Sequence, residues 1–286
     1  MAKDQRDLLA EIDATGSLPA EVTDDDLRGL ALRAVGADDL EAVDLLTAVA
    51  SLGERGVRHI LEVLERLDGV NLATAVSTLS NGTPFQVQVA IREAARHLDP
   101  RVRQAALAAI GDLEGIGESR DVDRRFEEVA SRALEDSDEG VRAIAAALLG
   151  TFRPLDGIPR LLRALKDESA RVRAEAVRSL GEYRNPSVNY ALIEALEDPD
   201  VTVAANAALT LGEVRATQAI EALAGMIRHH DENLAISAAQ ALASFGEPEA
   251  RHALQARLTE GVPRKVERVI KTLLRTTSDS DLVVED

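Results

Sequence analysis

The chain has 286 residues, of which 45% are hydrophobic and 29% charged, and this composition excludes an intrinsically disordered chain. Only 2% are aromatic, so small aliphatic side chains must fill the interior, which favours closely packed helices over a β-sandwich or barrel. The absence of cysteine excludes disulfides, thiolate catalysis and Cys-ligated zinc, and the net charge of −17 predicts repulsion of nucleic acid and anionic lipid.

Residues 1–23 precede the repeated part of the chain and are expected to be partly ordered. They open with mixed charge over residues 1–7 and contain no apolar signal core. No apolar run anywhere approaches the roughly 20 residues of a transmembrane helix. We therefore expect a cytoplasmic protein that makes no contact with a membrane.

The basic residues are unevenly divided, because only four of the 33 are lysines. An acid excess with scarce lysine and no cysteine resembles the usage of salt-adapted archaea. A high-GC bacterium would also replace lysine with arginine, although it has less reason for the acid excess. Both sources remain open at this point.

One phrase recurs along the chain and ends in glycine each time. At 99–111 it is Asp-Pro-Arg-Val-Arg-Gln-Ala-Ala-Leu-Ala-Ala-Ile-Gly. Related copies, some of them faint, end at Gly53, Gly82, Gly150, Gly181, Gly212 and Gly246. Most of these glycines follow one another at intervals of about 30 residues, which is typical of a helical-repeat protein. The longer interval from Gly111 to Gly150 predicts a loop insertion near 112–120.

Each repeat contains two stretches with apolar residues three and four apart, which predicts two helices. The second stretch begins at an Asp or Ser that suits an N-cap, and Pro100 occupies a first helical position. The closing glycine is expected to be the left-handed residue that ends the helix. The count gives eight helix pairs in a single domain over 24–275, followed by a disordered acidic tail at 276–286.

The phrase Asp-Pro-x-Val-Arg-x-x-Ala-x-x-x-Leu-Gly resembles the HEAT repeat, in the short Ala-rich form of the phycobilisome lyases (PBS lyase HEAT-like repeats). The resemblance covers about 38–275 and is strong at 99–246. It implies an all-α fold, a right-handed α-α superhelix (α-solenoid, armadillo-like) of about eight helix-turn-helix repeats. It also implies a protein-binding platform. HEAT-like adaptors join chemotaxis signalling to the motor in salt-adapted archaea, so signalling or motility is one expected setting.

Counting back from each closing glycine, at about 100° per residue, places three positions on one buried face of the second helices. They are nine, five and one residues before the glycine, and they hold Val, Ala and a large apolar residue in most repeats. The members are Val102, Val141, Val172 and Val203; Ala48, Ala106, Ala145, Ala176, Ala207 and Ala241; Leu52, Ile110, Leu149, Leu180, Leu211 and Phe245.

Arg103, Arg142 and Arg173 lie eight residues before the glycine, at the edge of this face. A partly buried guanidinium needs a carboxylate or carbonyl partner. The Asp at the start of its own or a neighbouring helix can supply one, so we expect a structural arginine ladder between repeats. A role in ligand binding is the alternative.

The opposite face of the second helices comprises the positions ten, seven, six and three before the glycine. In HEAT-like solenoids these helices line the concave side, so this face is the candidate partner groove, suited to a partner helix or an extended peptide. Its informative members are Arg101, Gln104, Ile144, Arg171, Glu175, Arg178, Asn206, Leu209, Ile236 and Gln240.

No catalytic, cofactor-binding or metal-binding residues are predicted. No His is followed by Glu, as it is in the related iron enzyme deoxyhypusine hydroxylase, and His229-His230 suits a helix C-terminus better than a metal. The acidic runs at 24–26 and 135–139 are expected to be solvated helix starts. We therefore expect a non-enzymatic adaptor for another protein. The alternative is a bilin-lyase-like enzyme or tetrapyrrole-binding protein, with Arg171, Arg173 and Arg178 near the propionates.

Overall fold

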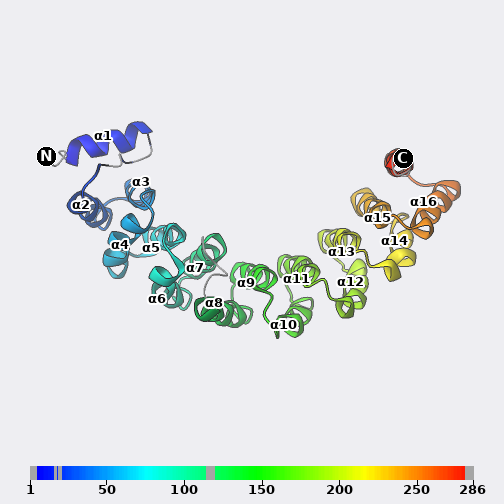
Figure 1. The fold of residues 1–286 in the computed structure, drawn as a ribbon, viewed down its shortest axis with the longest axis horizontal. Coiled ribbons are helices and arrows are strands. Elements are labelled where there is room, and N and C mark those ends of the chain that lie inside the picture. The colour runs from blue at the N-terminus through cyan, green and yellow to red at the C-terminus, as the bar shows by residue number, and fades with distance from the viewer. Residues whose placement is uncertain (1–4, 16–17, 19–20, 114–119, 281–286) are drawn as a thin grey trace, which may run out of the picture. The chain divides into compact units, whose positions relative to one another are not determined.

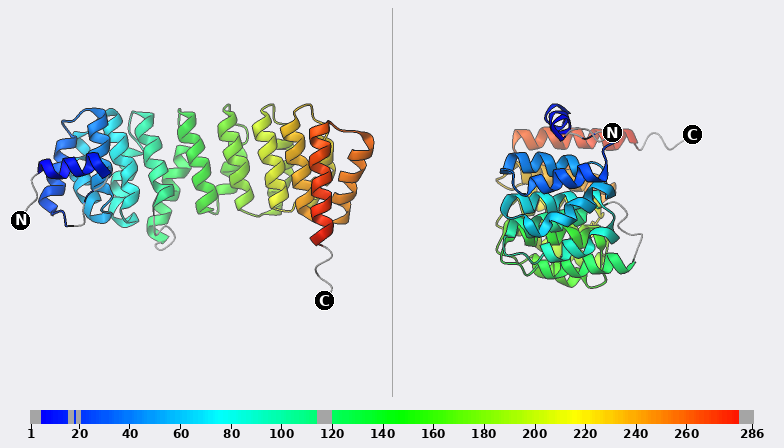
Figure 2. Two further views of the ribbon diagram at one scale, coloured as in Figure 1. Left: turned by 90° about the horizontal axis from the view of Figure 1, so that it is seen from above. Right: turned by 90° about the vertical axis from the view of Figure 1, so that its left-hand side faces the viewer.

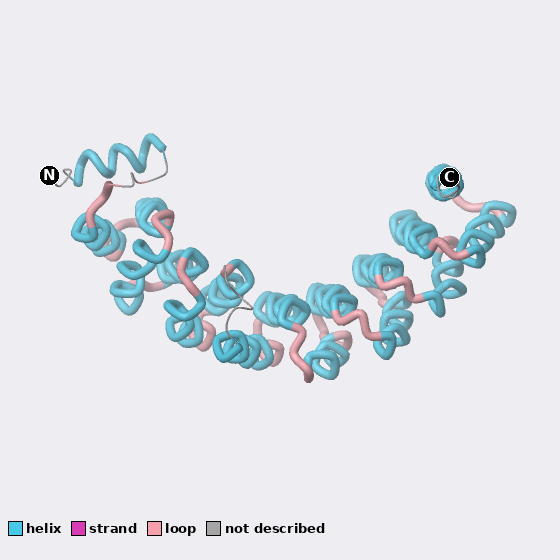
Figure 3. Tube along the Cα trace, in the orientation of Figure 1, coloured by secondary structure: helices cyan, strands magenta, loops and turns pink. Residues whose placement is uncertain are grey.

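The computed structural model describes residues 5–15, 18, 21–113 and 120–280. Every regular element in this part of the chain is a helix (Figures 1 and 3). The chain divides into two compact units, an N-terminal unit, Met1–Leu148, and a C-terminal unit, Leu149–Asp286. The described part contains no helix that is both long and apolar enough to cross a membrane.

The helices of the N-terminal unit are short, and two of them are followed directly by a 3-10 turn, Leu64–Arg66 and Thr78–Asn81. In chain order the α-helices are α1 (Gln5–Thr15), α2 (Asp24–Ala34), α3 (Asp39–Ala50), α4 (Glu54–Val63), α5 (Gly69–Ser77), α6 (Pro84–Ala94), α7 (Pro100–Asp112) and α8 (Arg120–Ala133).

Helix α9 (Glu139–Phe152) begins in the N-terminal unit and ends in the C-terminal unit. The helices that follow it are α10 (Gly157–Ala164), α11 (Ala170–Glu182), α12 (Asn189–Glu194), α13 (Val201–Glu213), α14 (Ile220–Met226), α15 (Glu232–Phe245), α16 (Pro248–Glu260) and α17 (Arg264–Ser280). Three 3-10 turns flank α12 and α14: Pro186–Val188, Ala195–Glu197 and Thr217–Ala219.

From α2 onward the helices pair consecutively, and the eight pairs run from α2–α3 to α16–α17, as the periodicity predicts. Helix α1 precedes them. Helix α17 continues to Ser280, past the predicted end of the repeats at 275. The rest of the predicted tail, 281–286, and most of the predicted insertion, 114–119, lie outside the described residues.

Within each unit the second helices of successive pairs pack on one another and form one layer, while the first helices form the other (Figures 1 and 2). In the N-terminal unit the second helices α3, α5 and α7 are in contact in series. In the C-terminal unit α11, α13, α15 and α17 are in contact in the same way.

The predicted start signals of the second helices are mostly confirmed. Asp99, Asp200 and Asp231 are N-caps whose carboxylates accept backbone N–H groups of the first turn. Ser169 also occupies the N-cap, but its side chain makes no capping hydrogen bond.

The predicted stop signal is wrong for most repeats. Gly111, Gly150, Gly181 and Gly212 lie inside helices, which continue for one or two more residues. Of the seven closing glycines only Gly53 and Gly246 have positive φ. In the C-terminal unit three arginines that follow α9, α11 and α13 also have positive φ, Arg153, Arg184 and Arg215, with φ of 50°, 46° and 52°.

Helix packing explains three of these four internal glycines. A Cβ on Gly150 would lie 2.9 Å from the Cα of Ser179, and one on Gly212 would lie 2.8 Å from the Cα of Ala241. A Cβ on Gly181 would lie 2.5 Å from Cγ2 of Thr210. Each glycine thus lets its second helix approach the next one, at distances that a methyl group would prevent.

The predicted core face is confirmed. The valines, alanines and large apolar residues at its three positions are buried, and nearly all of them are 2% exposed or less. Leu52 is the exception, because it is half-buried at the end of α3. The second helices therefore supply the central face of the hydrophobic core in both units.

Candidate partner-binding surface and the contacts that support it

The three arginines expected to form a ladder are all engaged at the turns between helices. Arg103 donates to the carbonyl oxygens of His97 and Leu98, at 2.8 and 3.0 Å, within its own repeat. It also forms a two-point ion pair with Asp136 in the next turn, at 2.6 and 2.8 Å. The guanidinium therefore ties one turn to the next.

The C-terminal unit repeats this arrangement at Arg173. Its Nη1 donates to the carbonyls of Asp167 and Glu168, at 2.9 and 3.2 Å, and its Nε and Nη2 donate to Asp198, at 2.7 and 2.8 Å. Arg142, which is 7% exposed, donates to the carbonyls of its own turn in the same way. The sequence predicts that the partner of the arginine is the aspartate at the helix start. In the structure the partners Asp136 and Asp198 each lie two residues before the N-cap.

The residue two before the N-cap performs a second task, because it accepts the N–H of the N-cap residue. Five turns share this contact, with acceptors His97, Asp136, Asp167, Asp198 and His229. The ring Nδ1 of His229 accepts from the N–H of Asp231 at 3.1 Å, so this ring satisfies the backbone donor of the N-cap residue.

Whether the acceptor is Asp or His correlates with one residue of the preceding repeat, the residue eight before its closing glycine. In the ion pairs of Asp136 and Asp198, the arginine comes from the preceding repeat, where it lies eight residues before the closing glycine. The same position holds Ala204 upstream of His229. An imidazole nitrogen can accept this N–H without leaving a carboxylate that lacks an arginine partner.

Burial raises the pKa of the Asp198 carboxyl, but the hydrogen bonds from Arg173 and from the backbone N–H of Asp200 outweigh that effect and hold the pKa below its usual value. Asp198 therefore stays ionised through the acidic range in which ordinary aspartates begin to protonate. The ion pair to Arg173 persists over the same range.

The predicted groove residues of the C-terminal unit lie on the neighbouring helices α11, α13 and α15. Leu209 is 38% exposed, and Ile236 is half-buried at the surface. Asn206 is half-buried, Gln240 is exposed, and neither side chain has a hydrogen-bond partner within the described chain. This group, Asn206, Leu209, Ile236 and Gln240, is called the α13–α15 face below.

The charged groove residues of the C-terminal unit belong to α11, which packs against α13 on one side of this face. Arg178 pairs with Glu175 one turn away, and Arg171 is exposed. Both members of the pair reach solvent, so its contribution to stability is small. Their role on this surface is to supply charge rather than to hold the fold.

Most of the predicted groove residues of the N-terminal unit serve the turns instead. Arg101 pairs with its own N-cap Asp99 at 2.6 Å, and the hydrogen bond from Arg101 lowers the pKa of Asp99 to about 2. Gln104 donates to the N-cap Asp138 at 2.8 Å and covers Gly140. Ile144 is half-buried.

The exposed face is also narrower than predicted. Ala143 and Ala239, seven residues before their glycines, are 1% and 0% exposed, and Gly140 is buried. In these two repeats position seven therefore belongs to the packing surface. Positions ten and three supply most of the exposed residues of this face, and position six is mostly half-buried.

A pocket of about 390 Å³ in the N-terminal unit was not predicted. It is lined mainly by apolar side chains of α4, α5 and α6, among them Leu61, Leu72 and Val89, with Glu65, Glu93 and His97 also in the lining. The apolar residues Phe85 and Val89 lie four residues apart on α6 and are 78% and 56% exposed, and Val89 lines the pocket. Their spacing is visible in the sequence, but their exposure is not.

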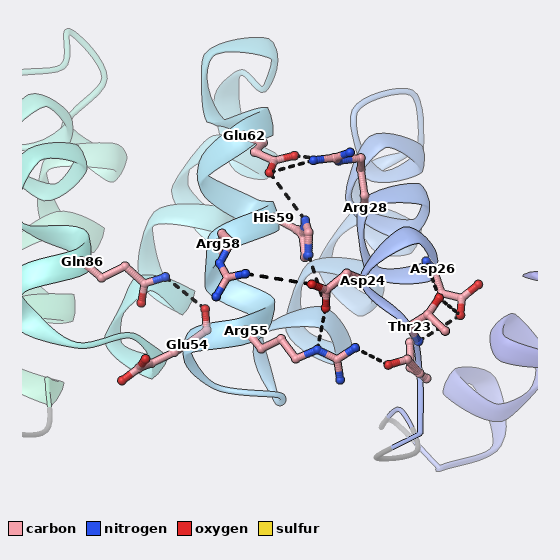
Figure 4. Close-up of polar contacts among 11 residues, drawn as sticks. Thr23, Asp24, Asp26, Arg28, Glu54, Arg55, Arg58, His59, Glu62 and Gln86 are labelled. Carbon is pink, nitrogen blue, oxygen red and sulfur yellow. Dashed lines mark hydrogen bonds and ion pairs between the residues drawn. The ribbon is translucent and has the colours of Figure 1, made fainter. Parts of the chain in front are cut away.

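A polar cluster joins α2 to α4 in the same unit (Figure 4). Arg55 pairs with Asp24 at 2.6 Å and Arg28 with Glu62 at 2.9 Å, and these hydrogen bonds hold the pKa of both carboxyls below their usual values. His59 lies between the two carboxylates, 4.0 Å from Asp24 and 3.7 Å from Glu62.

His59 is only 4% exposed, and neither ring nitrogen has a hydrogen-bond partner. The ring lies beneath the two ion pairs, Arg55–Asp24 and Arg28–Glu62, that join α2 to α4. Within the described residues there is no group of three or more His, Asp or Glu side chains placed to hold a metal ion.

The family model for HEAT repeats matches residues 126–200 and 189–275, which together span just over half of the chain. The chain belongs to the HEAT-repeat family. Its all-α architecture is accordingly that of an α-solenoid. The finer resemblance to phycobilisome-lyase repeats stays a prediction, and a comparison with the curated proteins finds no match in sequence.

Solved structures share the HEAT-repeat fold at low identity. YibA of Escherichia coli has a TM-score of 0.65 and 16% identity, over 96% of this chain and 98% of its own. Kap95p, whose binding induces the switch loops of RanGDP to adopt the GTP-bound conformation, has a TM-score of 0.62 and 14% identity, over 91% of this chain and 39% of its own. Human deoxyhypusine hydroxylase, with a TM-score of 0.39 and 17% identity, is too distant in structure to carry an argument.

Proposed function

We propose that the chain is a non-enzymatic scaffold that binds another protein, and that it holds a helix or extended peptide of that partner against the α13–α15 face. The observation that carries the proposal is the make-up of this face. An exposed leucine and a half-buried isoleucine lie beside two amides, Asn206 and Gln240, that have no partner within the described chain.

This combination suits a peptide ligand. Leu209 and Ile236 offer apolar contact area, and an amide can both donate to and accept from a peptide backbone. Because these residues lie on packed helices, the surface is preformed and loses little entropy on binding. The HEAT-repeat protein Kap95p binds the protein Ran, which shows that the fold supports protein binding without indicating a partner for this chain.

A matched pair of variants tests the proposal by capture of partners from native lysate. Leu209→Asp places a charge on the α13–α15 face, and Tyr190→Asp places one on α12 in the other layer, where Tyr190 is 71% exposed. We expect Leu209→Asp to lose a partner that the wild type and Tyr190→Asp both retain, with unchanged circular dichroism for all three. Loss in Tyr190→Asp alone would move the binding surface to the first helices.

We extend the proposal to the setting expected from the sequence, an adaptor in signalling or motility of a salt-adapted archaeon. The net charge of −17 supports it, because self-repulsion of a salt-adapted chain is relieved only by screening. The melting temperature should then rise clearly between dilute buffer and molar potassium chloride. A flat response would contradict salt adaptation and favour an ordinary high-GC cytoplasm.

A further inference from the structure

A second surface lies in the N-terminal unit, on the layer of first helices. Helices α6 and α8 are in contact and flank a cleft of about 500 Å³. Its lining consists of Arg92, Arg96, Arg124, Arg125, Glu128, Val129 and Arg132. Five arginines in one cleft are unexpected in a chain whose net charge is −17.

These side chains come from two segments of the chain. Arg92 lies in the last turn of α6, and Arg96 lies four residues later in the turn that follows this helix. Arg124, Glu128 and Arg132 follow one another at the same interval along α8. At a rise of about 1.5 Å per residue, the arginines of α8 extend over roughly 12 Å.

The charge within the cleft is poorly compensated. Glu128 is the one carboxylate in the lining, so five guanidinium groups face a single negative charge. The contact between Arg124 Nε and Glu128 Oε1 is 4.0 Å long, and the two side chains are 79% and 59% exposed, so this pair is weak. Like charges held this close repel one another, and a bound anion would remove that repulsion.

One arginine is held in place by a buried group. Arg125 donates from Nη1 to the side-chain oxygen of Gln88, which is 4% exposed. The amide nitrogen of Gln88 in turn donates to the carbonyl of Phe85 at 3.0 Å. The guanidinium of Arg125 is therefore positioned before any ligand arrives, which lowers the entropy lost on binding.

We propose that this cleft binds a polyphosphate group. Planar guanidinium forks match phosphate oxygens in two-point hydrogen bonds, and several adjacent phosphates are needed to engage arginines spread over both segments. Single-stranded nucleic acid fits less well, because the described lining has no aromatic side chain on which a base could stack. The site lies on the first helices and does not depend on the proposed partner surface.

The test is calorimetric titration of the full chain with inorganic tripolyphosphate at constant ionic strength. The wild type should bind at one saturable site. Arg96→Gln with Arg132→Gln should weaken binding by roughly tenfold or more, because charge-assisted hydrogen bonds from the turn after α6 and from α8 are lost. The matched control is Arg163→Gln with Arg268→Gln, which removes two exposed arginines of α10 and α17 and should leave affinity unchanged.

Parallel titrations separate the sources of such a group. ATP, inositol hexakisphosphate and tripolyphosphate share the chemistry, and the tightest of the three identifies the class of natural ligand. A single-stranded oligonucleotide provides the contrasting arm. The proposal is overturned if none of the three phosphates binds saturably, if the control variant weakens binding as much as the cleft variant, or if the oligonucleotide binds more tightly than all three.

Discussion

The two units are built from the same helix pairs, but their second helices meet in different ways. In the C-terminal unit the backbone approaches closely at Gly150 and Gly212, where a Cβ would lie 2.9 and 2.8 Å from a neighbouring Cα. In the N-terminal unit the corresponding Gly111 has only Leu148 Cδ2 nearby, 3.5 Å from the position of a Cβ. The same sequence position is a packing requirement in one unit and an open site in the other.

The earlier repeats of the N-terminal unit depart further from the pattern. Gly82 follows a 3-10 turn rather than lying within a helix, and α2 and α4 are joined by the polar cluster around His59. The family match at 126–275 omits these repeats. Close backbone approach of second helices at the closing glycine is thus a feature of the C-terminal unit, and the earlier repeats carry the unusual polar features.

The largest expected effect is loss of a ladder contact in the C-terminal unit. Arg173→Met should lower the free energy of unfolding by about 3 kcal/mol, because the carboxylate of Asp198, only 9% exposed, is left without its counter-charge. Urea denaturation followed by circular dichroism measures the change. Arg171→Met, two residues away and exposed, is the control and should change stability by no more than about 0.5 kcal/mol.

The glycine comparison predicts the next effect. Gly212→Ala should cost about 2 kcal/mol, since the new methyl group meets backbone atoms of α15 that cannot rotate away. Thermal and urea unfolding of the purified variant test it. A stabilised Gly212→Ala variant would show that α13 and α15 do not approach as closely as described.

The ion pair also predicts a pH dependence. Asp198→Asn should lower the free energy of unfolding by about 1–2 kcal/mol at pH 7, because Arg173 would then donate to a neutral amide instead of a carboxylate. Since the pKa of Asp198 is lower in the folded state, the wild-type advantage is complete above about pH 4 and is lost as the pH falls through the folded-state pKa. Unfolding series at successive pH values measure the difference, and a gap that stays constant down to pH 2 would exclude the pairing.

The smallest effect has the opposite sign. Gly111→Ala should stabilise the chain by about 0.5–1 kcal/mol, because alanine is the better helix residue and its methyl group makes only an ordinary contact. The same unfolding experiments detect it. Equal destabilisation of Gly111→Ala and Gly212→Ala would remove the distinction between the two units.

The helix pairs, most N-caps and the core face follow from the sequence, because each depends on local periodicity and on capping residues such as Asp200. The role of the closing glycine does not. Phase counting places Gly212 next to the core face. Only the structure shows that α13 continues through Gly212 and that α15 packs against it there. The periodicity shows which residues recur in each repeat, but not how closely the second helices of two repeats approach each other.

The candidate sites were predicted less well for the same reason. The α13–α15 face was found by phase, yet the burial of Ala143 and Ala239 depends on neighbouring helices. The arginine cleft escaped prediction because its members are divided between the end of α6, the turn after it and α8. The burial of His59 likewise depends on α2.

Site-specific photo-crosslinking tests the proposed scaffold function most directly. A photoreactive residue replaces Gln240 on the α13–α15 face in one variant and the exposed Glu221 on α14, in the layer of first helices, in the other. Irradiation in native lysate should join a partner protein to the Gln240 variant and leave the Glu221 variant uncrosslinked. Crosslinking from Glu221 but not from Gln240 would contradict the assignment of the partner to the second helices.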